Sequence, residues 1–469
     1  MEEIMELNID ALAQRFSGKL LLRNEIPLDE NTFQQMLSAK IFTPTQSIIR
    51  NFLSYQCNRC GNQERNLFAD IPCQLCHKTY IYCRKCIDMG RVMECEPLYY
   101  WSGDKPSWSE HEDPCSWEGE LTPKQQQAAE RITAAVKMKE NELLVWAVCG
   151  AGKTEMLFPG ITEALKLGMR ICIATPRADV VRELKPRLQH AFQQVPVQAL
   201  YGGSEDKDGT AQLMIATTHQ LLRMKEAFDM IVIDEIDAFP FHSDLSLPFA
   251  ASRAKKPTST TIYLTATPRK NHQSRIQQKK LPHIFVPVRY HGYALPVPKM
   301  KMSFSLQKDL QKDMPPSTLI SWLKKRKNQD RQLLIFVPTI SLAEKLLKNI
   351  AEVLLKERVI DNRKKIDFVH AEDPNRTEKV MQFREKELTV IITTTILERG
   401  VTFPSVDVAI FNAGHEVFDE AALVQIAGRA GRSADDPTGE VVFIHDGKTE
   451  AMVRAIDAIK QMNKRGGLH

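Results

Sequence analysis

A lysine and a threonine follow closely spaced glycines in the stretch AVCGAGKT, which spans residues 147–154. Glycine allows backbone N–H groups to approach phosphate oxygens, lysine reaches the β- and γ-phosphates, and a hydroxyl holds Mg²⁺. Ala147 stands where the general form of this pattern has glycine. Thr154 is the expected magnesium contact. The predicted ATP-binding loop consists of Gly150, Ala151, Gly152, Lys153 and Thr154.

Two adjacent carboxylates could supply the metal contact and the general base that a phosphate-binding loop needs for hydrolysis. The apolar run at 230–233 is a candidate buried strand, and Asp234 and Glu235 follow it directly. Side chains at the carboxyl end of such a strand lie where α/β sheets bind ligands. We predict that Asp234 holds Mg²⁺ through water and that Glu235 orients and deprotonates the water that attacks the γ-phosphate. For this pair alone, an acidic strand end facing solvent is the alternative.

Two arginines near the end of the chain offer the positive charge that phosphoryl transfer requires. Arg429 and Arg432 lie in QIAGRAGR, residues 425–432. Guanidinium suits bidentate contact with phosphate, and this spacing places both side chains on one face if the segment is helical. We predict that both are arginine fingers and that Gln425 also contacts the nucleotide. A solvated basic helix end is the alternative.

Three Cys-x-x-Cys pairs between residues 57 and 86 predict a metal site, because thiolates favour Zn²⁺ and two pairs complete a tetrahedral shell. The favoured zinc ligands are Cys57, Cys60, Cys83 and Cys86. TYIYCRKC at 79–86 is typical of a strand that leads into a helix, as in the second half of a treble-clef finger. Cys73 and Cys76 are an alternative or additional pair, with His77 and Cys95 as further alternatives. An iron–sulfur cluster is a lesser alternative.

Apolar runs alternating with helical stretches predict the elements that position these residues. Runs recur at 143–148, 170–175, 213–218, 230–235 and 261–267. A connector rich in proline, lysine and histidine follows at about 281–316, and the alternation resumes at 333–338, 366–371, 390–395, 407–412 and 440–445. Such alternation predicts parallel sheets covered on both faces. We predict an α/β fold with two tandem RecA-like lobes and an N-terminal zinc-finger module.

The predicted domain boundaries follow changes in composition. Residues 1–54 form an N-terminal segment without a recognised role, and residues 55–110 form the zinc module and linker. The first, ATP-binding lobe spans 111–298 and the second lobe spans 299–469. The stretch at 102–119, rich in proline, serine, glycine and acid, is typical of a linker, and the final NKRGGLH is expected to be a loose tail.

Composition excludes some classes of protein. Hydrophobic content of 43% and charged content of 26% are ordinary for a globular chain, so disorder is not expected. The net charge of +5 is compatible with nucleic acid as a partner but does not identify one. The acidic N-terminus lacks the regions of a secretory signal, and no apolar run is long enough for a transmembrane helix. We therefore expect a cytoplasmic protein.

Over residues 121–445 the chain resembles the DExD/H-type superfamily-2 helicases, with the motifs in the family's order. The resemblance implies that Gln125, in LTPKQ, reads the adenine edge and that the element Thr265-Ala266-Thr267 couples hydrolysis to strand binding. Elements at 174–177, 217–219 and 393–403 resemble those that grip a nucleic-acid backbone. The implied nucleic-acid contacts are Thr175, Pro176, Arg177, Thr217, Thr218, Thr395 and Arg399.

The position of the cysteines narrows the resemblance, because in PriA-type restart helicases they interrupt the second lobe and here they precede the first. This order, with AVCGAGKTE, VIDEIDAFP and TTTILERGVTFP, closely resembles the ComFA family of late-competence proteins. The resemblance implies an ATPase stimulated by single-stranded DNA that powers DNA import during natural transformation, peripheral at the cytoplasmic face of the membrane. It also implies ATP, Mg²⁺ and Zn²⁺ as cofactors, and ComFC, DprA and the channel ComEC as partners.

Two other functions stay open at this point. Backbone grips do not specify the sugar, so a PriA-like duplex-unwinding DNA helicase in repair or restart, or an RNA helicase, is the first alternative. The second is a zinc-bearing nucleic-acid-binding scaffold that uses ATP as a switch. Glu235 and the two arginines argue against a mere switch, because they belong to the chemistry of hydrolysis.

Overall fold

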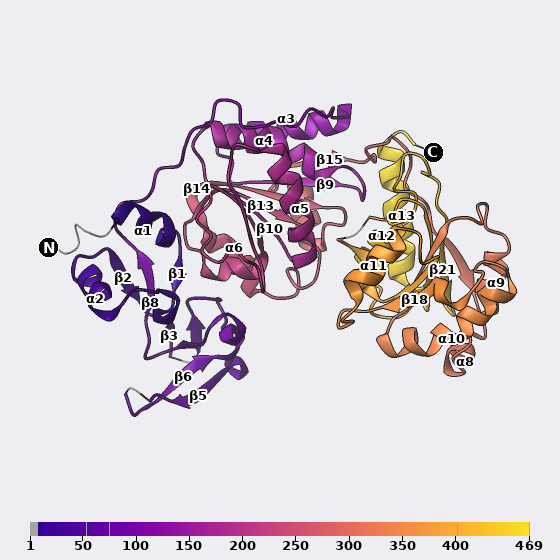
Figure 1. Ribbon diagram of the computed structural model, residues 1–469, viewed down its shortest axis with the longest axis horizontal. Coiled ribbons are helices and arrows are strands. Elements are labelled where there is room, and N and C mark those ends of the chain that lie inside the picture. The colour runs from indigo at the N-terminus through magenta and orange to yellow at the C-terminus, as the bar shows by residue number, and fades with distance from the viewer. Residues whose placement is uncertain (1–7, 53, 75, 401, 469) are drawn as a thin grey trace. The chain divides into compact units, whose positions relative to one another are not determined.

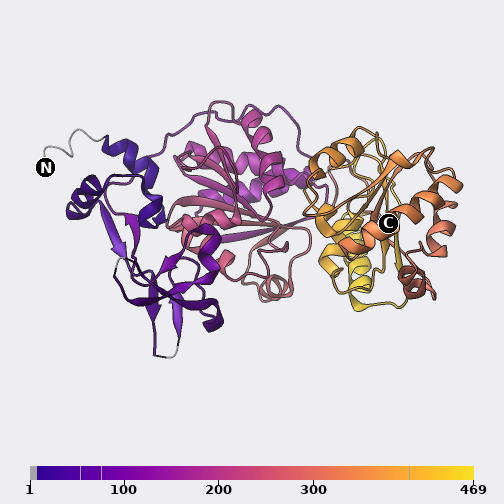
Figure 2. The same ribbon diagram turned by 60° about the horizontal axis from the view of Figure 1, so that its bottom comes forward.

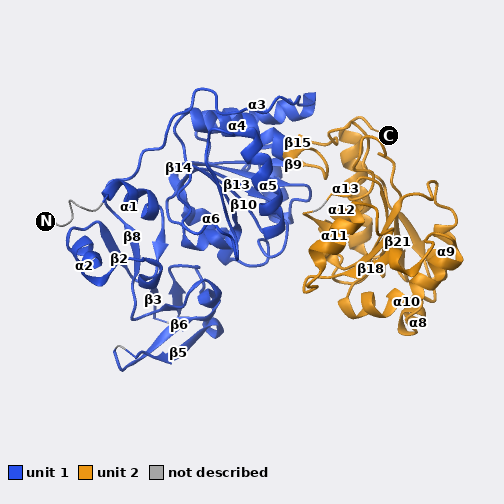
Figure 3. Ribbon diagram, viewed as in Figure 1, with its two compact units in different colours: residues 1–145, 154–284 blue, residues 146–153, 285–469 orange. Residues whose placement is uncertain are grey.

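The computed structural model describes residues 8–52, 54–74, 76–400 and 402–468. The chain forms two compact units, blue and orange in Figure 3: residues 1–145 with 154–284, and residues 146–153 with 285–469. This division differs from the predicted lobe boundary after residue 298. The connector belongs to the second unit in part because the Leu295 N–H and C=O hydrogen-bond to the Asn463 side chain at 2.8 and 2.9 Å. Val401, within the predicted contact element 393–403, lies outside the described residues.

The N-terminal segment is a small α/β layer. Its antiparallel sheet has the order β1-β8-β2, with β1 (Leu20–Leu21), β2 (Phe42–Thr45) and β8 (Leu98–Trp101). Helices α1 (Ile9–Phe16) and α2 (Glu30–Ser38) are capped by the side chains of Asn8 and Asp29, which accept backbone N–H groups of the first turn. Because β2 pairs with β8, the cysteine module between them is an insertion into this layer.

The cysteine module contains a two-stranded and a three-stranded sheet. The first pairs β3 (Ile48–Arg50) with β4 (Tyr55–Cys57), and the second has the order β5-β6-β7, with β5 (Phe68–Pro72), β6 (Thr79–Cys83) and β7 (Val92–Met93). Figures 1 and 2 show this module beside the N-terminal helices. The predicted strand at 79–83 is present, and the segment after it, η4 (Arg84–Met89), is a 3₁₀ helix that ends at Gly90, where φ is 103°.

A seven-stranded sheet forms the core of the first lobe, in the order β11-β12-β10-β13-β14-β9-β15. Neighbouring strands from β11 to β14 in this order pair in parallel. The strands are β9 (Glu142–Ala147), β10 (Ile171–Thr175), β11 (Val197–Leu200), β12 (Leu213–Thr217), β13 (Phe228–Asp234), β14 (Lys255–Thr265) and β15 (His283–Val286). The helices are α3 (Pro123–Lys137), α4 (Lys153–Lys166), α5 (Ala178–Ala191), α6 (Ser246–Ala254) and α7 (Lys270–Gln277), with the 3₁₀ helix η5 (Thr218–Arg223).

The second lobe has a six-stranded sheet in the order β16-β21-β20-β17-β19-β18, and each of its strand pairs is parallel. The strands are β16 (Lys299–Met302), β17 (Gln332–Phe336), β18 (Ile366–Val369), β19 (Val390–Thr393), β20 (Val406–Phe411) and β21 (Val441–His445). The helices are α8 (Leu306–Gln311), α9 (Ser317–Leu323), α10 (Ile340–Lys356), α11 (Arg376–Arg384), α12 (Glu420–Ala427) and α13 (Glu450–Arg465), with the 3₁₀ helix η7 (Thr395–Glu398).

Every strand run predicted after residue 121 is a strand of one of these two sheets. The strands that the sequence pattern missed, β11, β15 and β16, all lie at a sheet edge. An edge strand has one unpaired side and is often half-exposed, so it lacks the continuous apolar run of a central strand. The loose tail was a wrong prediction for residues 463–465, which belong to α13.

The segment predicted to be a linker is irregular, but it is packed against the first lobe. Residues 102–119 contain almost no regular structure, yet they run along the first lobe. The Ser116 N–H donates to the Ala191 carbonyl at 2.7 Å, and the Trp117 ring meets Phe158 edge to face at 5.5 Å. None of the helices in the described part of the chain has both the length and the apolar character that crossing a membrane requires.

Candidate functional site

The predicted phosphate loop lies between β9 and α4. Its two glycines have left-handed backbone angles, with φ of 80° at Gly150 and 69° at Gly152, and α4 begins at Lys153. Only glycine adopts these angles without strain, and the first turn of α4 presents backbone N–H groups next to the loop. The local geometry of strand, glycine turn and helix start is therefore that of an anion-binding loop.

The two catalytic candidates Asp234 and Glu235 lie at the end of β13. Asp234 is the last residue of the strand, and its carboxylate accepts the Glu235 backbone N–H at 2.9 Å. Glu235 has a φ of 55°, which is uncommon for a residue with a side chain and costs roughly 1 kcal/mol or more. This turn ends the strand at Asp234.

Asp237 joins the acidic segment to the coupling element at the end of β14. Its fully buried carboxylate accepts the hydroxyls of Thr265, at 2.6 Å, and Thr267. The Arg269 guanidinium donates to the Asp237 carbonyl at 2.9 Å. Asp237 was not among the predicted site residues, although its place two residues after Glu235 was a usable signal. A movement of either segment must move the other, because the carboxylate binds both hydroxyls.

The first-lobe nucleic-acid candidates lie at the same edge of the sheet as the acids. Thr175 ends β10 and stands opposite Thr217, the last residue of β12. On the other side of β10 lies β13, which ends at Asp234. The hydroxyl oxygens of Thr175 and of Thr218, which follows β12, are buried and have no hydrogen-bond partner within the described residues. Unpartnered buried hydroxyls cost about 1–3 kcal/mol each, so they are typical of places that a ligand completes.

The other first-lobe candidates are buried or interact with neighbouring side chains and backbone. Pro176 is buried and Arg177 is half-exposed, 3.9 Å from the Asp179 carboxylate. Burial lowers the pKa of His219 in η5, so this imidazole is neutral near pH 7. Gln125 takes part in a capping box at the start of α3, where its side-chain oxygen accepts the Thr122 N–H at 2.7 Å. The cap fixes this amide at the helix start.

The arginine segment of the second lobe is not helical. Helix α12 ends at Ala427, Arg429 lies in the turn that follows, and Arg432 comes just after that turn. The Arg429 guanidinium is buried and donates to the Glu398 carbonyl of η7 at 2.8 Å through Nε. Arg432 is half-exposed, with Nε donating to the Gly428 carbonyl at 3.0 Å. The premise of one shared helix face is thus wrong, because the two glycines of the segment follow the helix end, and Arg432 is the more accessible side chain.

The second unit also contains residues 146–153, which include the phosphate loop up to Lys153, and this segment contacts the arginine segment within the unit. The Cys149 thiol donates to the side-chain oxygen of buried Gln425 at 2.9 Å. The Gln425 side-chain nitrogen has no hydrogen-bond partner within the described residues. Arg289 is buried, donates to the carbonyls of Ala430, at 2.9 Å, and Gly431, and has its pKa lowered to about 10 by burial. Sequence reasoning gave no role to Cys149, which occupies a variable position of the stretch AVCGAGKT, or to Arg289, which lies in the connector.

The remaining second-lobe candidates lie around η7. Thr395 is the first residue of η7 and is half-exposed. Arg399 follows it, is almost fully buried, and forms an ion pair of 3.2 Å with Glu398. Arg429 therefore holds the segment that carries both candidates, through its bond to the Glu398 carbonyl.

The four favoured cysteines form one buried cluster. The sulfurs of Cys57, Cys60, Cys83 and Cys86 all lie within 4.8 Å of one another. The pair Cys57–Cys86 is separated by 3.8 Å and the pair Cys60–Cys83 by 3.6 Å. A tetrahedron of thiolates around Zn²⁺ has sulfur–sulfur edges of about 3.8 Å, given zinc–sulfur bonds of about 2.3 Å. These residues therefore fit a single zinc ion, and the spacing leaves no room for a multi-iron cluster.

The four thiols perturb one another. Hydrogen bonding with Cys57 lowers the pKa of Cys83, and it raises the pKa of Cys60 and of Cys86. Several thiolates cannot share a buried volume unless a cation offsets their charge.

Ion pairs and hydrogen bonds attach this cluster to the first lobe, within the same unit. Arg253 of α6 donates to the carbonyl oxygens of Asn58, at 2.8 Å, and Arg59, which lie between the first two cysteines. Glu25 bridges the fully buried Arg59 and Arg223 of η5, at 2.8 and 2.6 Å. The cluster thus supports η5, the 3₁₀ helix that starts with Thr218.

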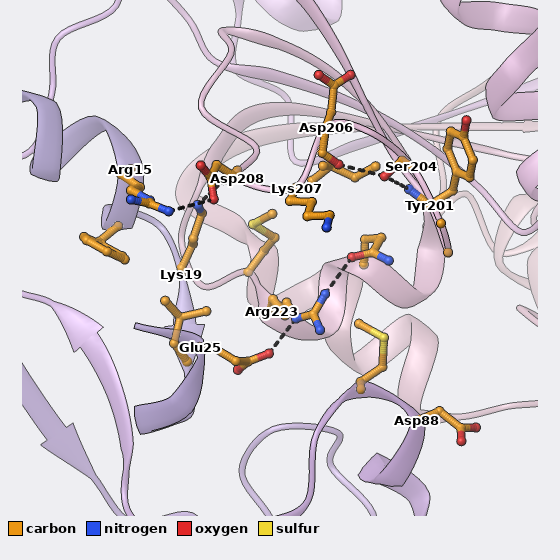
Figure 4. A pocket seen from close by; sticks show the side chains of 18 residues that line it. Arg15, Lys19, Glu25, Asp88, Tyr201, Ser204, Asp206, Lys207, Asp208 and Arg223 are labelled. Atoms are coloured by element: carbon orange, nitrogen blue, oxygen red, sulfur yellow. Dashed lines mark hydrogen bonds and ion pairs between the residues drawn. The ribbon is translucent and has the colours of Figure 1, made fainter. Parts of the chain in front are cut away.

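A cavity of about 560 Å³ lies where the N-terminal segment and η4 meet the first lobe (Figure 4). Arg15 pairs with Asp208 across it at 3.3 Å, and the Lys19 ammonium donates to the Asp208 carbonyl. Burial, with the nearby Arg170 charge, lowers the pKa of Lys19 to about 7. Basic and acidic side chains alternate around this cavity, so it is a junction between parts of the unit rather than a basic groove.

Comparison with known families divides the chain into three matched regions. Residues 6–100 match the competence protein ComFA N-terminal domain, residues 118–270 match the type III restriction enzyme res subunit, and residues 315–434 match the helicase conserved C-terminal domain. The competence protein ComFA of Bacillus subtilis is 43% identical over 97% of this chain and 95% of its own length. The competence protein ComFA of Streptococcus pneumoniae is 38% identical over 88% of this chain and 97% of its own length.

Solved structures share the two-lobe fold at low sequence identity. A variant of Saccharomyces cerevisiae Dbp5, solved with RNA and ADP BeF3, is 16% identical with a TM-score of 0.51, over 74% of this chain and 93% of its own. The DEAD-box helicase Mss116, solved with single-stranded RNA, is 15% identical with a TM-score of 0.52, over 74% of this chain and 83% of its own. These likenesses confirm the predicted pair of RecA-like lobes. With helicase-type domains and full-length relatives of 43% and 38% identity, this ATPase of the helicase and translocase type belongs to the competence protein ComFA family.

Proposed function

We propose that this protein hydrolyses ATP to move along single-stranded DNA and that this movement draws DNA across the cytoplasmic membrane during natural transformation. The observation that carries the proposal is an adjacency along one sheet edge. Thr175 and Thr217 end β10 and β12, and Asp234 ends β13 on the other side of β10. Candidate strand contacts and candidate hydrolysis groups therefore occupy neighbouring strands.

Each group has a distinct task in this proposal. Lys153 and the loop N–H groups bind the phosphates of ATP, and Glu235 takes the proton of the attacking water. Thr154, and Asp234 through water, would hold Mg²⁺, which would offset the charge of the phosphates. Arg432 and the Gln425 side-chain nitrogen contact the γ-phosphate from the second lobe, while Arg429 orders the segment that carries Thr395 and Arg399.

Asp237 converts hydrolysis into movement. Its carboxylate holds Thr265 and Thr267 at the end of β14, next to β13. Loss of the γ-phosphate displaces the acidic segment, and the coupling threonines move with it. The strand contacts of the two lobes then alternate between holding and releasing a backbone, with little dependence on sequence.

Zinc at the four-cysteine cluster keeps the N-terminal module folded, and that module supports η5 through Glu25 and Arg253. Membership of a competence family favours DNA as the strand. The family resemblance also implies ComFC, DprA and ComEC as partners and a peripheral position at the cytoplasmic face of the membrane. Co-purification of these three proteins with the full chain tests that part.

The first experiment measures ATP hydrolysis by the full chain with no nucleic acid, single-stranded DNA, duplex DNA or single-stranded RNA. Strong stimulation by single-stranded DNA, absent in Glu235→Gln, is the expected result. Stimulation by RNA alone would favour an RNA helicase, and the absence of any stimulation would favour an ATP-switched scaffold. A strand-displacement assay then separates translocation from PriA-like unwinding.

A further inference from the structure

The cysteine module contains a second sulfur cluster, separate from the four-cysteine cluster. The sulfurs of Cys73, Cys76 and Cys95 lie within 4.8 Å of one another. Cys73 and Cys76 come from the connection between β5 and β6, and Cys95 follows β7, so the three-stranded sheet brings them together. Cys73 is buried, Cys95 is half-buried and Cys76 is exposed.

The backbone around Cys73 repeats the backbone around Cys57. In the first turn the Cys57 N–H donates to the Asn62 carbonyl at 3.0 Å and the Gly61 N–H donates to the Cys57 carbonyl at 2.8 Å. In the second turn the Cys73 N–H donates to the Lys78 carbonyl at 2.8 Å and the His77 N–H donates to the Cys73 carbonyl at 2.9 Å. The first turn delivers two sulfurs to the four-cysteine cluster, so the second is built in the same way to deliver two sulfurs.

The residue after the second cysteine of each turn has left-handed backbone angles. Gly61 has a φ of 72° and His77 has a φ of 54°. Glycine adopts this conformation freely, whereas histidine is strained there by roughly 1 kcal/mol or more. A metal bound to the flanking sulfurs supplies free energy that offsets this strain.

The two clusters are independent sites. The four-cysteine cluster already has a complete tetrahedral set, and no cysteine belongs to both clusters. The sulfurs of the second cluster are thiols, and an odd number of them could not all pair as disulfides. His77 lies outside this cluster, so its imidazole is not the fourth ligand in this structure.

We propose that a second Zn²⁺ binds to the thiolates of Cys73, Cys76 and Cys95, with its fourth coordination position open to solvent. Three protein ligands with one open position distinguish this site from the closed structural one. The exposure of Cys76 places the open position at the surface, where an imidazole or a thiol from outside the chain can replace water. The proposal does not rest on the function proposed above.

The test counts zinc in the full chain purified under reducing conditions without chelators. Two zinc ions per chain are expected for the native protein, one for Cys95→Ser, and two for the matched control Cys115→Ser, whose cysteine lies outside both clusters. One zinc in the native protein, or two in Cys95→Ser, would overturn the proposal. Failure of the translocase proposal appears only in hydrolysis and strand assays, so the two are distinguishable.

Cobalt tests the open position. With Co²⁺ in both sites, added imidazole should change the thiolate-to-metal absorption of the native protein and leave that of Cys95→Ser unchanged. His77→Asn keeps a residue that tolerates the left-handed conformation, and it should retain both zinc ions. Loss of the second zinc in His77→Asn, or no response to imidazole, would contradict an open fourth position.

Discussion

The cysteine module and the carboxyl edge of the first-lobe sheet belong to one compact unit but use their buried polar groups differently. In the module, the carbonyls between the first two cysteines accept from Arg253, and Arg59 is paired with Glu25. At the sheet edge, buried hydroxyls of Thr175 and Thr218 lack partners within the described residues. The module therefore uses charged side chains to tie its first cysteine turn to the first lobe, whereas the sheet edge presents hydroxyls that a ligand can complete.

Removing a zinc ligand should have the largest effect, and this effect should be a loss of stability. Cys57→Ser leaves three buried thiols around the first metal position, and structural zinc contributes about 10–16 kcal/mol of binding free energy in small zinc domains. We expect loss of that zinc and unfolding of the module, measured as rapid amide exchange over residues 48–93. ATP binding measured with a fluorescent nucleotide should fall much less. Equal loss of both would contradict the division of roles.

Glu235→Gln should have the opposite effect: hydrolysis is lost while stability and ATP binding are kept. Loss of the general base lowers the hydrolysis rate by about 10²- to 10⁴-fold, while the isosteric amide preserves the turn. ATP binding and the thermal unfolding temperature should stay close to those of the native protein. Glu235→Asp is the matched control, because it keeps the charge but shortens its reach. Hydrolysis within a factor of two of native in Glu235→Gln would exclude Glu235 as the base.

Arg253→Ala tests the attachment between the two regions. The substitution removes hydrogen bonds from a half-buried guanidinium to four carbonyls, those of Asn58 and Arg59 in the module and those of Leu222 and Met224 in and beside η5. We expect a loss of about 2–4 kcal/mol. Zinc content should be unchanged, while proteolysis between the module and α6 should accelerate. Strand-stimulated hydrolysis should fall more than unstimulated hydrolysis, because η5 loses support. Arg275→Ala, at a surface ion pair with Glu142, is the control and should cost less than about 1 kcal/mol.

Lys19 should give a smaller, pH-dependent effect at the junction. Its folded pKa of about 7 lies below the ordinary lysine value of 10.5, so the unfolded chain binds more protons between these values. The free energy of unfolding should therefore rise with pH above 7, by at most about 1.4 kcal/mol per unit. Lys19→Met should flatten this rise and stabilise the protein near pH 7. An unchanged slope in chemical denaturation would show that Lys19 is not its source.

Thr175→Val should give the smallest effect on stability and a selective effect on strand binding. Because the hydroxyl is buried without a partner among the described residues, its removal should leave stability unchanged or raise it by up to about 1 kcal/mol. Stimulation by single-stranded DNA should fall about fivefold, the loss of roughly one hydrogen bond. Thr175→Ser keeps the hydroxyl and should retain stimulation. A loss of stability in Thr175→Val without a loss of stimulation would make this threonine a packing residue.

The sequence determined the parts of the protein that depend on neighbours along the chain. The predicted strand runs, the glycine loop before α4, the acids at the end of β13 and the four favoured cysteines all follow from local spacing. Such features were readable because a buried central strand must be apolar and a phosphate loop must contain glycine. The edge strands β11, β15 and β16 were not readable, since exposure removes that requirement.

Only the tertiary structure decided which distant groups meet. The clamp of Asp237 on Thr265 and Thr267, the grip of Arg253 on the first cysteine turn and the meeting of Cys95 with Cys73 each join residues separated in sequence. No periodicity encodes such pairs, because side-chain partners across elements are selected by packing and by the need to satisfy buried polar groups. The point at which α12 ends, before Arg429, was also decided by the tertiary structure. Glycine weakens a helix without fixing where it stops, so tertiary contacts set the last helical residue.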